Sequence, residues 1–173
     1  MTIQDLAVVS VAYVTWLAAV VYFTRPTRRR FAGALAGGAA VGFVLPPVIA
    51  LVASLGWWSV PVRWTPTSIP MLYLAIVLGC TPLFLISWRI DRRFRANGLA
   101  IFVAIAALIG VARSYAIAAI FPEWMVISSG VAPALAIAAT YAGIVALGHS
   151  AMHLIAGPSQ ADELVRLSDS SSR

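Results

Sequence analysis

Long runs of apolar residues, separated by short polar connections, dominate the chain. Five runs are long enough to cross a bilayer, which takes about 20 residues at a rise of 1.5 Å each. They cover Ile3–Phe23, Phe31–Leu55, Ile69–Trp88, Gly98–Ile120 and Val126–Ala156. The pattern predicts an all-α fold, in which residues 1–157 form a bundle of five transmembrane helices and residues 158–173 form a short tail.

The composition agrees with a membrane location. Of 173 residues, 61% are hydrophobic and 10% are charged, and the mean hydropathy is +0.92. Soluble domains carry roughly a quarter charged residues. Most of the surface must therefore face lipid or other membrane helices, which makes the bilayer the first expected partner.

Arginine placement predicts the orientation. Two short connections hold eight of the 12 basic residues: Arg25, Arg28, Arg29 and Arg30 in one, and Arg89, Arg92, Arg93 and Arg95 in the other. By the positive-inside rule both connections are cytoplasmic, so the N-terminus lies outside and the C-terminal tail, partly disordered, lies in the cytoplasm. The expected location is the plasma membrane of a bacterium or archaeon, and the use of arginine alone fits a GC-rich genome.

The residues that are missing exclude several kinds of protein. The chain has no lysine, which rules out a Schiff base to retinal or pyridoxal phosphate and also a P-loop. Its one cysteine, Cys80, excludes an intramolecular disulfide and a CxxC redox pair.

The six acidic residues lie at the predicted edges or in the tail, so no catalytic residue is predicted and the protein is expected not to be an enzyme. The arginines flank apolar runs rather than forming a patch on a polar domain, so no nucleic-acid partner is expected.

Arg113 is the one cation inside a predicted span, where a guanidinium is costly and marks a polar pathway or a pair. Its height in the bilayer makes several residues of the outer half candidate partners: Asp5, Ser10, Glu123, Thr140 and Tyr141. The simpler interpretation is a structural pair with Glu123 or Asp5. The alternative is that Arg113 and Tyr115 bind a carboxylate, a phosphate or a lipid headgroup.

His149 and His153 lie four residues apart and so share one helix face near the predicted cytoplasmic boundary. Interfacial, hydrogen-bonded histidines are the simplest interpretation, followed by a proton or headgroup role. A metal site needs a third ligand, for which that half offers Cys80, Met152, Asp91 or water. We therefore predict no metal site and no cofactor, although both histidines remain candidate binding residues.

Small residues on the second run favour close helix packing. The spacings from Gly33 to Gly37 and from Gly38 to Gly42 allow another helix to approach closely. That helix belongs to this chain, to a partner protein or to a second copy. The tryptophans of the outer connection, Trp57 to Trp64, suit a short non-helical segment at headgroup level.

Three functions follow as hypotheses. The preferred one is a non-enzymatic subunit or assembly protein of a membrane complex, because the spans carry little polarity and have glycine-rich faces. The second is a small oligomeric transporter or channel that uses Arg113 to contact an anion or headgroup. The third is a lipid- or cofactor-handling protein that uses His149 and His153.

Overall fold

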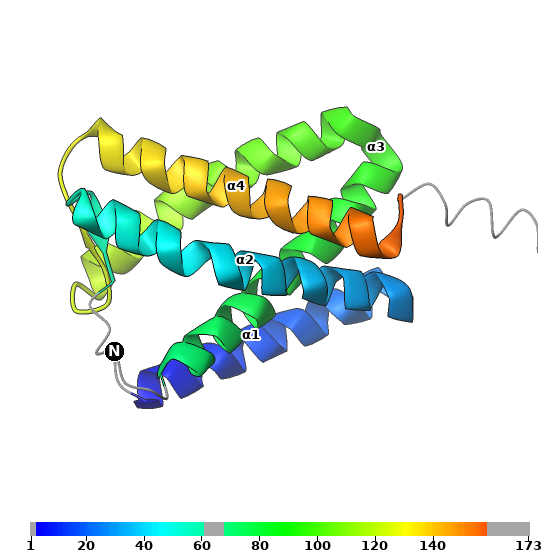
Figure 1. Cartoon of the computed structure of the whole chain (residues 1–173), viewed down its shortest axis with the longest axis horizontal. Coiled ribbons are helices and arrows are strands. Elements are labelled where there is room, and N and C mark those ends of the chain that lie inside the picture. The colour runs from blue at the N-terminus through cyan, green and yellow to red at the C-terminus, as the bar shows by residue number, and fades with distance from the viewer. Residues whose placement is uncertain (1–2, 61–67, 159–173) are drawn as a thin grey trace, which may run out of the picture.

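The fold is all-helical, as predicted, apart from two very short strands. The computed structural model describes residues 3–60 and 68–158, without the side chains of residues 3–7, 9 and 68. Four helices follow in the order α1 (Ile3–Thr24), α2 (Arg28–Ser54), α3 (Ser68–Ile120) and α4 (Val131–Ala156) (Figure 1). Within the described residues, α2, α4 and the range Ile69–Ile120 of α3 are long and apolar enough to span a membrane.

The predicted count of five helices is not supported: the third and fourth predicted spans fall in one 53-residue element, α3, whose two helical arms join at a kink. No glycine or proline lies between Pro82 and Gly98, and the arginines of this stretch are good helix formers, so the helix continues where a loop was predicted. It turns back on itself at Arg95, whose backbone is non-helical (φ 56°, ψ −152°). Figure 1 shows the resulting two arms of α3.

The start of the last span also differs from the prediction. Val126–Ile127 forms a strand, β2, which pairs in antiparallel fashion with β1, Trp58–Ser59. Helix α4 begins only at Val131, after Gly130, whose φ of 120° suits glycine. Hydropathy did not separate the strand from the helix, because valine and isoleucine are apolar in both and favour strands.

Helix α2 packs against both α3 and α4 and lies antiparallel to α4 (Figure 1). Glycines allow the close approach: a Cβ added to Gly37 would lie 2.5 Å from the carbonyl oxygen of Gly148, and one on Gly38 would lie 2.9 Å from that of Val77. Gly33 and Gly42 are buried as well. Contacts within the chain thus involve all four glycines.

The two groups of arginines lie at the same end of the bundle. Arg89 on α3 donates hydrogen bonds from Nη1 to the carbonyl oxygens of Phe23 (3.1 Å) and Thr24 (3.3 Å), at the end of α1. The bend of α3 at Arg95, the end of α1, the start of α2 and the end of α4 share this end (Figure 1). The predicted tail after Pro158 and residues 61–67 of the outer connection lie outside the described residues.

Candidate functional site

Four polar side chains from α3 and α4 meet near the arginine-rich end of the bundle. Ser87 and Asp91 lie four residues apart on α3, and His149 and His153 lie four residues apart on α4. Residues at this spacing lie one above the other on a helix face. The two facing helices therefore bring two pairs of polar groups together inside an apolar bundle.

The two imidazoles converge on one carboxylate. His153 Nε2 lies 3.4 Å from Asp91 Oδ2, and His149 Nε2 lies 4.0 Å from the same oxygen. The two rings lie side by side, with centroids 4.7 Å apart. One ligand atom from each of the three residues falls within 4.8 Å of the others, which makes this a set of three potential metal ligands.

Ser87 orients the His149 ring. Its hydroxyl donates to the carbonyl oxygen of Phe84 (3.0 Å) and lies 2.9 Å from His149 Nδ1. The serine oxygen can accept a hydrogen bond from Nδ1–H of His149 while its own proton is donated to Phe84. In that arrangement the neutral ring carries its lone pair on Nε2, the nitrogen that lies 4.0 Å from Asp91 Oδ2.

His153 presents a second imidazole nitrogen to Asp91. Its Nε2 is buried and, in the described part of the chain, makes no hydrogen bond, although it lies 3.4 Å from Asp91 Oδ2. A buried polar atom without a hydrogen bond is costly unless a charge or an ion compensates it. With the nitrogen of His149 and the carboxylate of Asp91, it forms a group of electron-pair donors that a proton or a metal ion would hold together.

Close packing fixes the position of His149. The preceding residue, Gly148, lies against the Phe84 ring so closely that an added Cβ would overlap the ring atoms. Phe84 is fully buried and also contacts Gly37 of α2. Any bulk at Gly148 would push α4 away from α3 and separate the histidines from Asp91.

Arg30 holds the end of α4 that carries His153. Its side chain is 1% exposed, and its guanidinium donates to the carbonyl oxygens of Gly157 (2.5 Å) and Pro158 (2.7 Å). It also lies 5.5 Å from the centre of the Trp88 ring. These bonds satisfy carbonyls that a helix end leaves free, and they tie α2 to the last turn of α4.

Arg113 lies in a different place from the histidines and does not pair with Glu123. Its guanidinium donates to the hydroxyl oxygens of Tyr141 (2.9 Å) and Tyr13 (3.2 Å). Glu123 is exposed in the turn beyond the end of α3, and no ion pair joins it to Arg113 within the described residues. Tyr115 is 39% exposed and forms no hydrogen bond with Arg113, since residues two apart point to opposite sides of a helix. The side chain of Asp5 lies outside the described residues.

The sequence analysis missed several residues that build these sites. It assigned Arg30 to the orientation signal, whereas the structure buries this side chain, and it did not single out Ser87 or Tyr13. Asp91 was one of four alternatives for a third ligand, because its predicted loop position gave no reason to place it beside the histidines. A signal was nevertheless present: Asp91 and Ser87 have the same spacing as the two histidines.

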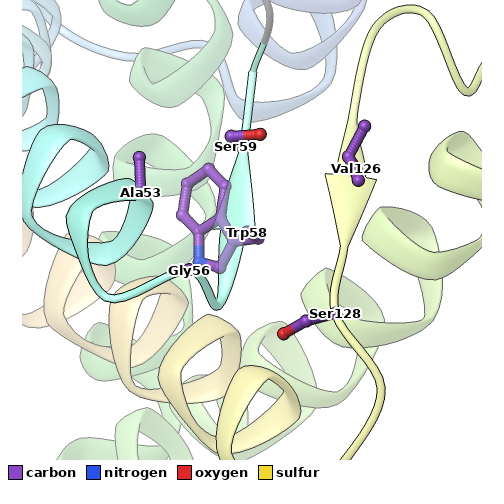
Figure 2. A pocket seen from close by; sticks show the side chains of 6 residues that line it. All are labelled: Ala53, Gly56, Trp58, Ser59, Val126 and Ser128. Atoms are coloured by element: carbon purple, nitrogen blue, oxygen red, sulfur yellow. The ribbon is translucent and has the colours of Figure 1, made fainter.

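A small cavity lies at the other end of the bundle, beside the two strands. It has a volume of about 120 Å³ and is lined by Ala53, Gly56, Trp58, Ser59, Val126 and Ser128 (Figure 2). Small-molecule sites usually measure about 300–1,000 Å³. Because this cavity is smaller and no charged side chain lines it, the candidate site remains the cluster of Asp91, His149 and His153.

Comparisons with protein families, with curated protein sequences and with solved structures find no match to this chain. The function is therefore argued from the geometry of the chain itself.

Proposed function

We propose that this protein is a polytopic membrane protein that binds a divalent transition-metal ion through His149, His153 and Asp91. The observation that carries the proposal is the convergence of three ligand atoms, from two helices, within 4.8 Å of one another. Binding an ion would satisfy the buried Nε2 of His153, which has no hydrogen bond. The proposal concerns binding and assigns no residue a catalytic role.

The distances are close to those that a metal requires. Zinc bonds nitrogen and oxygen at about 2.0–2.2 Å, which puts neighbouring ligands of a tetrahedral ion about 3.4 Å apart. Asp91 Oδ2 lies 3.4 Å from His153 Nε2 and 4.0 Å from His149 Nε2. The three ligand atoms lie up to 4.8 Å apart, so the two imidazole rings would have to move closer together to hold one ion.

The ligand types favour particular ions. Two imidazoles and one carboxylate suit Zn²⁺ or Fe²⁺, whereas Ca²⁺ and Mg²⁺ prefer oxygen ligands throughout. Three protein ligands leave at least one coordination position for water or an external ligand. Ser87 acts as the outer partner that orients one metal-binding imidazole.

The topology proposed with this function has the two arms of α3 and helices α1, α2 and α4 each crossing the bilayer. The N-terminus would lie outside and the metal site at the cytoplasmic end, in the plasma membrane of a bacterium or archaeon. The shared location of the two arginine groups, linked by Arg89, supports this orientation through the positive-inside rule.

The test is metal binding by the purified protein in detergent. We expect the wild-type protein to bind one Zn²⁺ per chain in a calorimetric titration, and His149→Ala, His153→Ala and Asp91→Asn to lose that binding while remaining folded. Glu123→Gln is the matched control, because it removes an exposed carboxylate at the opposite end. A wild-type protein that bound no Zn²⁺ or Fe²⁺, or a Glu123→Gln variant that lost binding, would refute the proposal.

A second candidate function is that of a subunit or assembly protein in a membrane complex. It is favoured by an apolar groove of about 400 Å³ between α2 and the start of α3, lined by Gly42, Phe43, Pro46, Ile69, Pro70, Leu72 and Tyr73. The Phe43 side chain there is 73% exposed. A transmembrane helix of another protein would fill this groove. Purification in mild detergent should then recover a stoichiometric partner that Phe43→Ala releases, and recovery of the chain alone would count against this function.

A further inference from the structure

The cluster around Arg113 brings together three helices. Tyr13 comes from α1, Arg113 from the second arm of α3 and Tyr141 from α4. The guanidinium donates one hydrogen bond to each phenol, at 3.2 Å for Tyr13 and 2.9 Å for Tyr141. Each phenol accepts through its oxygen and keeps its own O–H proton available for another acceptor.

Both tyrosine rings pack against glycines of α3. A Cβ added to Gly110 would overlap the ring of Tyr141, and one added to Gly79 would lie 3.2 Å from the ring of Tyr13. The rings thus lie directly on helix backbones, which limits their movement. The geometry around Arg113 is therefore fixed before any ligand arrives, which lowers the cost of binding.

No carboxylate of the described residues neutralises Arg113. The ion pairs found among these residues join His149 and His153 to Asp91, at the arginine-rich end. Arg113 lies about 10 Å before the end of α3 at Ile120, at 1.5 Å per residue. A guanidinium at that depth in a bilayer is costly unless an anion or water accompanies it.

The side chain faces the exterior of the bundle. Arg113 is exposed, and so are its neighbours on the same arm, Ile109 (61%) and Leu108 (71%). These apolar side chains face lipid if α3 crosses the membrane. An anion that reaches Arg113 from this side must therefore carry, or lie beside, acyl chains.

We infer that Arg113, Tyr13 and Tyr141 form a binding site for an oxyanion, the phosphate group of an anionic membrane lipid. The guanidinium supplies the positive charge, and the two phenol protons donate to phosphate oxygens. Arginine in a membrane draws headgroups and water inward by local thinning of the bilayer, which brings a lipid phosphate within reach. This site is separate from the metal ligands and does not depend on them.

The experiment compares lipids bound to the delipidated protein. Native mass spectrometry and thermal unfolding are measured with phosphatidylglycerol, with phosphatidylcholine and with inorganic phosphate as probes. We expect phosphatidylglycerol to bind at least about tenfold more tightly than phosphatidylcholine, whose phosphate is already paired with its own choline cation; tenfold corresponds to about 1.4 kcal/mol. Stabilisation by inorganic phosphate alone would support the same oxyanion site with a free solute as its occupant.

Variants separate this site from general attraction of anionic lipid to a basic protein. Arg113→Gln should abolish the preference for phosphatidylglycerol, and Arg113→Lys should retain part of it. Arg28→Gln removes an exposed arginine at the other end and should leave the preference unchanged. If Arg28→Gln and Arg113→Gln reduced the preference equally, or if the wild-type protein showed none, the inference would be overturned.

Two further variants keep the test decisive. Should Arg113→Gln fail to fold, the double variant Tyr13→Phe/Tyr141→Phe keeps both rings and the charge but removes both phenol donors, and it should weaken phosphatidylglycerol binding. Asp5→Asn tests whether a carboxylate of this chain is the anion instead. If Asp5→Asn reduced the stability of the lipid-free protein as much as Arg113→Gln does, the assignment of the site to an external anion would be wrong.

Discussion

The two polar clusters of this bundle suit ligands of opposite charge. At the arginine-rich end, two imidazoles and a carboxylate direct lone pairs toward one another within 4.8 Å. Farther along the bundle, the guanidinium of Arg113 has two phenols as partners and, among the described residues, no carboxylate. The first cluster carries ligand types that suit a cation and the second carries donors that suit an anion, which is the basis of the two binding sites proposed for this chain.

Burial separates the clusters as clearly as charge does. His149 is 7% exposed and is enclosed by packing of α2, α3 and α4, whereas Arg113 is exposed on the side of the bundle. A small ion suits the enclosed site, and a lipid suits the exposed one. Variants that affect one cluster and leave the other intact test this difference.

The largest effect is expected from Gly148→Ala. The added methyl group would overlap the Phe84 ring, so we expect a loss of about 1–3 kcal/mol of stability and impaired zinc binding. Gly143→Ala is the matched control on the same helix, because a Cβ there meets nothing within 4 Å and alanine favours a helix by about 0.5–1 kcal/mol. Thermal unfolding in detergent measures both. If Gly148→Ala and Gly143→Ala changed the stability equally, the close packing of Gly148 beside His149 would be contradicted.

The next effect is expected from Ser87→Ala, which removes the hydrogen-bond partner of His149 Nδ1. Loss of such an outer partner weakens metal binding about 10–100-fold, and isothermal titration with Zn²⁺ measures the change. Ser54→Ala is the control, since that hydroxyl bonds only to the carbonyl of Leu51 at the end of α2. Unchanged zinc affinity in Ser87→Ala would show that the serine does not orient the ring.

These expectations show what the sequence could and could not supply. Hydropathy predicted an all-helical membrane protein because apolar runs of about 20 residues are typical of transmembrane helices. The spacing of His149 and His153 placed them on one face of a helix. Asp91 joined them only through the packing of α3 on α4, which depends on distant contacts such as that between Gly148 and Phe84.

The helical continuation before the bend at Arg95 illustrates a second limit. Residues around Asp91 are polar, which a hydropathy plot reads as a loop, although they have good helix propensity and contain no glycine or proline. Helix α3 therefore continues to Arg95 before it turns. This continuation keeps Asp91 on the helix face that meets the histidines, so the error in the fold and the missed ligand have one cause.

A smaller, graded effect is expected from pH. Metal ligation requires neutral imidazoles, so protons compete with the metal as the pH falls. Zinc affinity should therefore decrease on acidification, by up to about tenfold per pH unit for each histidine proton displaced. Lipid binding at Arg113 should stay constant over the same acidification, because arginine remains charged. A pH-independent zinc affinity would argue against histidine ligands.

The smallest effect is expected from Tyr13→Phe alone. It removes one of the two phenols that contact Arg113 and leaves the ring against Gly79. Loss of one such hydrogen bond corresponds to about 0.5–1.5 kcal/mol, or roughly a 2- to 12-fold weaker binding of phosphatidylglycerol. Tyr22→Phe, whose side chain is exposed near the other end of α1, is the control. If both substitutions changed the affinity for phosphatidylglycerol equally, Tyr13 would not be part of the lipid site.

The most direct test of the central claim is X-ray absorption spectroscopy of the zinc-loaded protein. The account predicts a first shell at about 2.0–2.1 Å made of nitrogen and oxygen alone, with the multiple-scattering features of two imidazoles. His153→Ala should reduce these features to those of one imidazole. A shell that contained sulfur at about 2.3 Å, as from Cys80, or one that lacked imidazole altogether, would contradict a site built from His149, His153 and Asp91.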